Sequence, residues 1–193
     1  PRVNTNGTHN DIPLLDAFLN PAAYHDGGSV GELSSQEAAG AILMGISDQT
    51  GQEIDEFVVE TLRNHLLGLP LDLPSVNMAR ARSEGIPSLN NVRKQIHAQT
   101  NDGQMAPYAH WVDFGEGLKH HTSLVNFVAA YGKHPDIVAA DTAAAKREIA
   151  NQIVNWEDFP GVAPDDAEDF MKSLGDWQND DQGNTTTGLE EVD

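Results

Sequence analysis

Residues 71–90 read LDLPSVNMARARSEGIPSLN, and this string predicts two adjoining helices. Asp72 is placed to cap the first helix, which runs from about Leu73 to Glu84, because an aspartate there accepts hydrogen bonds from free backbone N–H groups. Gly85, followed closely by a proline, ends this helix. Ser88 is placed to cap the second helix, whose first turns hold Leu89, Val92, Arg93 and Ile96.

Helices are also predicted on the N-terminal side of this string. Residues 12–19 offer a short apolar helical turn, which the following Asn-Pro pair stops. Ser34 and Glu37 form a capping box for a longer helix, whose inner face holds Ala38, Ala41, Ile42 and Gly45. A further helix runs from about Asp55 to Leu67 and stops at Gly68, and its inner face holds Phe57, Val58, Leu62 and Leu66.

The C-terminal side adds helices at residues 124–131, 142–154 and 164–174, and no alternating strand pattern of useful length occurs. The fold class is therefore mainly α, an irregular multi-helix array. Residues 1–11 are polar and are predicted to be loop. We expect residues 1–175 to form one helical domain. Residues 176–193 have almost nothing to bury and are predicted to be a loose, polar, acidic linker.

Composition narrows the classes of partner. The 193 residues include 11 Lys and Arg against 30 Asp and Glu, a formal net charge of −19. Such a surface repels phosphate backbones and anionic lipid, which excludes nucleic acid and membranes as partners. The same charge would attract cations such as calcium. Alternatively, the charge only keeps the protein soluble in salty surroundings. Cysteine is absent, so disulfides and thiolate sites are excluded. No apolar run approaches the roughly 20 residues of a transmembrane helix.

Residues 71–90 resemble the most recognisable string of the animal haem peroxidase superfamily: Leu-Asp-Leu, then Asn-Ile/Met-x-Arg-x-Arg, then Asp-x-Gly-Ile/Leu-Pro, then Asn. The ending Pro-Ser-Leu-Asn, followed by Arg93, is closer to the bacterial secreted branch, whose members often carry RTX-type calcium-binding repeats. Residues 12–21, 56–67 and 187–193 are similar to other segments of the family. The resemblance implies an internal piece, with residues 1–175 forming the C-terminal half of the catalytic core.

The resemblance assigns two haem-facing residues to this string. Asn77 matches the family's asparagine that accepts a hydrogen bond from the ring N–H of the proximal histidine. Arg80 matches the arginine on the same helical face that binds a haem propionate. Arg82 is expected to hold backbone or acidic side chains, and Asn90 and Arg93 are expected to pack back against the helix.

The resemblance also implies that essential groups lie outside the chain. The family's distal residues and its proximal histidine precede the segment that begins at Pro1, and the proximal string Phe-Arg-x-Gly-His does not occur here. His25 is the nearest histidine by position but follows the point where the ligand belongs. Two departures within the string are Ser83, where the family commonly has Asp, and Glu84, where animal members have His.

Other histidines and aromatic residues are predicted to be structural. No carboxylate-framed metal motif such as His-Glu-x-x-His occurs around His110, His120, His121 and His134. The adjacent His120 and His121 are expected to be a solvated surface pair. The acidic stretch from Asp176 does not fit a calcium-loop register, so no metal site is assigned. Residues 107–114 hold three aromatic side chains, which we interpret as a packing anchor.

On this resemblance the parent protein is a secreted haem peroxidase that reduces hydrogen peroxide and oxidises halide or small organic donors. The chain alone is expected to be inactive. Its expected partner is the remainder of the parent polypeptide, which would bury its apolar faces. Alternatively, two copies of the fragment could form a homodimer that buries these faces. Calcium is a further expected ligand. The alternative function is a non-enzymatic helical module of a large secreted calcium-binding adhesin or toxin-like protein.

Overall fold

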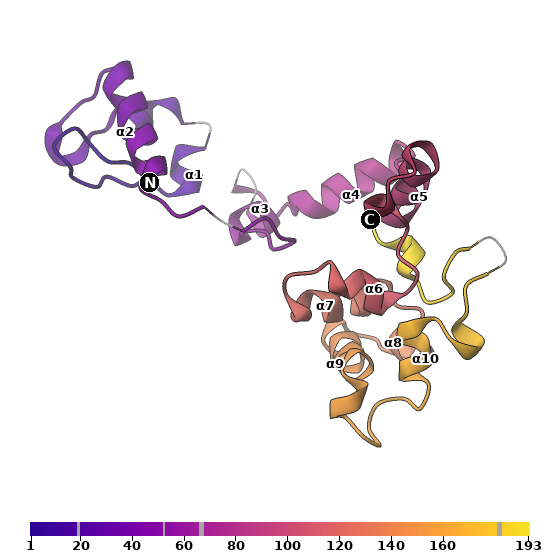
Figure 1. Cartoon of the computed structure of the whole chain (residues 1–193). Coiled ribbons are helices and arrows are strands. Elements are labelled where there is room, and N and C mark those ends of the chain that lie inside the picture. Colours follow the sequence, from indigo (N-terminus) through magenta and orange to yellow (C-terminus); the bar gives the residue numbers. More distant parts are fainter. Residues whose placement is uncertain (19, 52, 66–67, 181–182) are drawn as a thin grey trace. The chain divides into compact units, whose positions relative to one another are not determined.

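The computed structural model describes residues 1–18, 20–51, 53–65, 68–180 and 183–193. These ranges are mainly α, as predicted, and within them the only extended pairings are two isolated antiparallel bridges. The chain divides into two compact units, Pro1–Ala79 and Arg80–Asp193 (Figure 1). The α-helices are α1 (Leu14–Ala17), α2 (Ser35–Ser47), α3 (Glu60–Asn64), α4 (Leu73–Ser83), α5 (Leu89–Thr100), α6 (Trp111–Glu116), α7 (His121–Tyr131), α8 (Pro135–Ala139), α9 (Ala143–Val154) and α10 (Ala167–Lys172).

The first unit is built around α2, whose start is the predicted capping box. The Ser34 hydroxyl accepts from the Glu37 backbone N–H, and the Glu37 carboxylate accepts from the Ser34 backbone N–H at 2.9 Å. One face of α2 is buried, as predicted, at Ala38, Ala41 and Gly45. This face packs on the polar N-terminal segment, where the Val3 N–H donates to the Ala41 carbonyl at 2.9 Å.

The N-terminal segment is loop, as predicted, but part of it is buried. Arg2 is only 4% exposed. Its guanidinium donates to the carbonyls of Asn10, Tyr24 and Asp26 at 2.7–3.0 Å. Because every one of these acceptors is a backbone carbonyl, Arg2 links two segments of the chain, around residue 10 and at residues 24–26, and its guanidinium has no acidic partner among the described residues.

The helix predicted for residues 55–67 is shorter in the structure. It is α3, Glu60–Asn64, and residues 66 and 67 lie outside the described residues. Phe57 and Val58 precede the helix and are 55% and 39% exposed, so the inner face assigned to them is wrong. Apolar spacing alone does not make a helix, because most helical stability in proteins comes from burying an apolar face.

The second unit has one core, made by α6 to α10 and the C-terminal residues. Trp111, Val128, Ile153 and Phe170 are fully buried in it. The aromatic stretch at residues 107–114 is the predicted packing anchor, since the Phe114 ring meets the ring of Tyr108 edge-on at 5.3 Å and that of Trp111 at 5.8 Å. Helices α6 and α8 were not predicted. Each begins at a histidine whose Nδ1 accepts a backbone N–H, a cap that the usual Ser, Thr, Asp and Asn pattern does not include.

The C-terminal end is the largest difference from expectation. The prediction that it has almost nothing to bury is wrong for Thr185, Thr187, Leu189 and Val192, each at most 3% exposed. The Thr187 carbonyl accepts from the Lys133 N–H at 2.9 Å, and the Val192 carbonyl accepts from the Leu89 N–H at 2.8 Å. The segment therefore completes the core of the second unit, while a domain boundary at residues 175 and 176 stays a prediction.

None of the helices in the described part of the chain is long and apolar enough to span a bilayer.

Candidate functional site

Helix α4 carries both predicted haem-facing residues, and its two ends are fixed as the sequence predicts. The Asp72 carboxylate accepts from the Ser75 N–H at 3.1 Å. At the other end Gly85 takes a left-handed conformation, with φ of 74°. The Ile86 N–H then reaches the Ala81 carbonyl and the Gly85 N–H reaches the Arg82 carbonyl, a Schellman ending.

Asn77 and Arg80 are three residues apart on α4, which places them within about 60° of each other around the helix axis. Both side chains are exposed. Within the described ranges, neither the Asn77 amide nor the Arg80 guanidinium has a protein partner. The Arg80 guanidinium is therefore available as a donor, and the Asn77 amide oxygen is available as an acceptor.

The other arginine of α4 is occupied. The Arg82 guanidinium forms an ion pair with the Asp193 carboxylate, which raises the pKa of Arg82 through that hydrogen bond. This confirms the expectation that Arg82 binds an acidic side chain. The contact joins α4 to the C-terminal residue within the second unit.

Asn90 and Arg93 on α5 hold the segment before α6. The Asn90 amide exchanges two hydrogen bonds with the Tyr108 backbone, at 2.7 and 2.9 Å. Arg93 donates to the Ala106 and Gln104 carbonyls, and its guanidinium lies 4.1 Å from the centre of the Tyr108 ring. The side-chain hydrogen bonds of both residues are therefore made to the following loop, and their packing against the preceding helix stays a prediction.

Most of the histidines are engaged in structural hydrogen bonds. His25 and His97 each place Nδ1 2.8 Å from a backbone carbonyl, of Leu33 and Asp102 respectively. A carbonyl only accepts, so Nδ1 carries the proton in both rings. His121, expected to be solvated, is exposed but also contacts the Asn155 amide oxygen through Nε2 at 2.6 Å.

His134 is the one buried histidine of the described chain, 3% exposed. Its Nδ1 accepts from the Asp136 N–H at 3.2 Å, so Nε2 carries the proton and donates to Asp166 at 3.1 Å. The Trp177 indole stacks on the imidazole, with ring centres 5.7 Å apart, and donates to the other oxygen of Asp166 at 3.0 Å. Both ring nitrogens are thus used, which makes His134 a structural residue.

Partial burial alone would raise the pKa of Asp166, but the hydrogen bonds from Trp177 and His134 outweigh it and lower that pKa. A lowered pKa in the folded state gives stability that is present above the unfolded value of about 3.9 and is lost as the pH falls through the lower folded value.

We therefore expect Asp166→Asn to destabilise the second unit at pH 7, by up to about 1 kcal/mol because the carboxylate is half-exposed. The difference from the wild type should shrink as the pH falls below about 4, which urea unfolding at several pH values measures. Asp165→Asn, an exposed neighbour, is the charge-matched control. An equal loss in both variants would contradict the assignment.

Comparison with known proteins finds matches to part of the chain. The sequence pattern of the family described as Animal haem peroxidase matches residues 1–142. Peroxinectin A of Dictyostelium discoideum is 31% identical over 96 residues, and the aligned stretch covers 47% of this chain and 16% of that protein. No solved structure matches the chain significantly.

Proposed function

Because the chain belongs to the animal haem peroxidase family, we propose that it supplies the proximal-side supporting helix of a haem-dependent peroxidase. The proposed activity is reduction of hydrogen peroxide with oxidation of halide or organic donors. The observation that carries the proposal is the state of α4: Arg82 is paired, whereas Asn77 and Arg80 are exposed and have no partner in the described part of the chain.

The two side chains fit the chemistry of a haem. The planar guanidinium of Arg80 can bind one propionate through two parallel N–H bonds. The amide oxygen of Asn77 can accept a ring N–H from the histidine that ligates the iron, which fixes the tautomer of that ring and increases its basicity. Bound haem supplies the redox chemistry with peroxide, and these residues orient it.

We propose that the axial histidine comes from the remainder of the parent polypeptide. His134 has both ring nitrogens engaged, and His25, the nearest candidate by position, is half-buried with Nδ1 held by the Leu33 carbonyl. On this proposal the chain alone has no appreciable peroxidase activity. Apolar side chains on and before α4, such as Leu71 at 40% and Met78 at 39% exposed, are surfaces that the remainder would cover.

Secretion, the bacterial branch and a calcium requirement remain part of the proposal. The net charge of −19 supports only the calcium requirement, because an acidic surface attracts cations. The helical module without enzymatic activity stands as the alternative. A purely structural helix has no need for an exposed, unpartnered arginine next to a paired one, and this difference favours the peroxidase.

Binding of an iron-free porphyrin tests the role of Arg80 separately from iron ligation. We expect Arg80→Gln to weaken binding of protoporphyrin IX about tenfold, because a charge-assisted hydrogen bond contributes about 1.5–3 kcal/mol. Porphyrin fluorescence measures the affinity. Lys146→Gln on α9 removes the same charge elsewhere and should leave the affinity unchanged.

The dimethyl ester of the same porphyrin lacks both carboxylates and should bind the wild type and Arg80→Gln equally weakly. If Arg80→Gln binds the free diacid as tightly as the wild type does, Arg80 does not anchor a propionate. If the ester binds as tightly as the diacid, the carboxylates are not recognised at all.

A further inference from the structure

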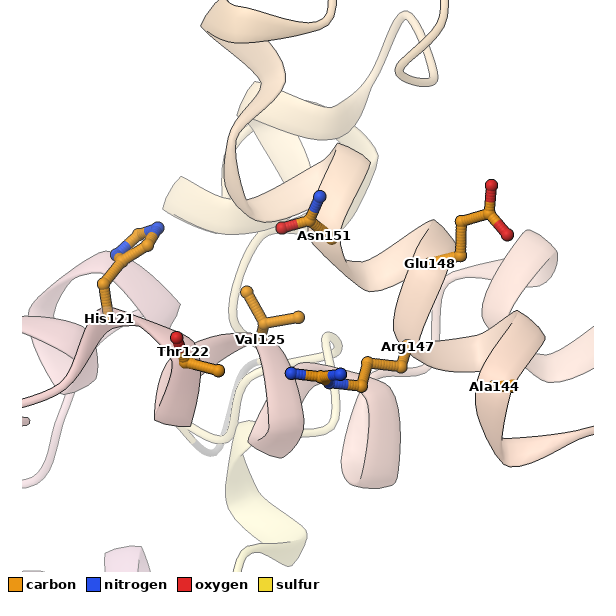
Figure 2. Close-up of a pocket in the computed structure, with 7 residues that line it drawn as sticks. All are labelled: His121, Thr122, Val125, Ala144, Arg147, Glu148 and Asn151. Carbon is orange, nitrogen blue, oxygen red and sulfur yellow. The ribbon is translucent and has the colours of Figure 1, made fainter.

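A second candidate site lies in the second unit, in a pocket of about 460 Å³ between α7 and α9 (Figure 2). This volume is within the range of about 300–1,000 Å³ that is typical of sites for small molecules. The lining residues are His121, Thr122 and Val125 from α7 and Ala144, Arg147, Glu148 and Asn151 from α9.

Arg147 places a cationic hydrogen-bond donor, its guanidinium, in this pocket. Its Nε donates to the Asn126 amide oxygen on α7 at 2.9 Å, which draws the side chain across from α9. Figure 2 shows the guanidinium reaching toward Thr122 and Val125. Among the described residues no carboxylate pairs with Arg147, so its terminal N–H groups are available to a ligand.

The remaining wall is polar on one side and apolar on the other. The Asn151 amide oxygen accepts from the Asn155 amide at 3.0 Å, which leaves its NH₂ group as a donor. Val125, 4% exposed, and Ala144 provide the apolar part of the lining. Glu148 is the one acidic lining residue, and in Figure 2 its carboxylate points away from the guanidinium of Arg147.

We propose that this pocket binds a small organic carboxylate with an apolar body. The guanidinium matches the planar carboxylate through two parallel hydrogen bonds, the Asn151 amide adds a donor, and Val125 contacts the body of the molecule. The lining residues on α9 lie after residue 142, where the family match ends, and none of the lining residues is on α4.

The charge of the chain opposes an anion at long range but not at the pocket. The net charge of −19 is spread over all 193 residues. At physiological ionic strength the Debye length is about 8 Å, so distant carboxylates are screened while the cation in direct contact is not. Binding should therefore be measured at that ionic strength, where the local guanidinium decides the outcome.

Titration of the whole chain with benzoate, followed by backbone amide NMR shifts, tests the proposal. We expect saturable shifts at Thr122, Val125 and Asn151 with millimolar affinity. Benzamide has the same shape without the charge and should not saturate the site. Arg147→Gln should weaken benzoate binding at least tenfold, whereas Lys146→Gln, the adjacent cation on α9, should leave it within twofold of the wild type.

Circular dichroism of both variants checks that the fold is kept. Equal affinity of benzoate and benzamide would overturn the carboxylate assignment. An equal loss in Arg147→Gln and Lys146→Gln would reduce the effect to general electrostatics and overturn the role of Arg147. The absence of saturable shifts at tens of millimolar benzoate would overturn the site itself. The protoporphyrin result with Arg80→Gln is independent of all three outcomes.

Discussion

Trp111→Ala is expected to lower the free energy of unfolding of the second unit by about 3–5 kcal/mol, as loss of a buried tryptophan side chain typically does. Trp111 is fully buried, and its ring meets the Phe114 ring edge-on at 5.8 Å. Its indole N–H points to the Thr187 carbonyl at 3.4 Å. The substitution therefore leaves a cavity in the core and also releases a contact to the C-terminal segment.

Urea unfolding followed by circular dichroism measures the loss, and hydrogen exchange locates it. Exchange should accelerate at Leu189 and Val192, which are each 1% exposed. Trp111→Phe keeps most of the aromatic volume and should lose clearly less stability than Trp111→Ala. Val138→Ala, at a site 62% exposed, is the control for loss of an exposed apolar side chain. A loss below about 1 kcal/mol in Trp111→Ala would contradict a core closed by the C-terminal segment.

Three of the predicted helices that are confirmed, α2, α4 and α9, begin at a capping side chain. Ser34 with Glu37, Asp72 and Thr142 each sit where a side-chain oxygen accepts a backbone N–H, and the structure contains all three caps. Ser88 was predicted from the same rule and does precede α5, but its hydroxyl accepts from the Asn91 side chain instead of the backbone. Local rules thus place a helix start even where the capping bond differs.

The errors come from interactions between residues distant in sequence. Leu189 and Val192 are two apolar residues in a polar stretch, and composition predicts a loose end. They are buried because the second unit offers them a core and because the Lys133 and Leu89 N–H groups bond to this segment. In contrast, Phe57 and Val58 have helical spacing but remain exposed. Burial depends on tertiary partners that spacing does not reveal.

In the candidate site too, some features could be predicted from the sequence and others depend on contacts between distant residues. The resemblance to a family selects Asn77 and Arg80 and separates Arg80 from Arg82, but only the structure identifies the partner of Arg82. The partner of Arg82 is Asp193, 111 residues away, which no local pattern reveals. Likewise, nothing near Arg147 in the sequence indicates a pocket, since three of the seven lining residues come from α7.

Haem binding is expected to depend on Asn77 and Arg80 and to give no histidine-ligated spectrum in the chain alone. The first expectation follows from the unpartnered Asn77 amide and Arg80 guanidinium on α4, as the described part of the chain shows them. The second follows from the proposal that the axial histidine lies outside the chain. Added imidazole can take the place of that ring, and the Asn77 amide oxygen would accept its N–H.

The most direct measurement is a haem titration of the chain with absorbance read in the Soret region, with and without imidazole, beside an Asn77→Ala, Arg80→Ala variant. We predict no sharp histidine-ligated band without imidazole, such a band once imidazole is added, and at least tenfold weaker haem binding by the variant, from loss of a charge-assisted bond. A sharp histidine-ligated band without imidazole, or equal binding by the variant, would contradict the account.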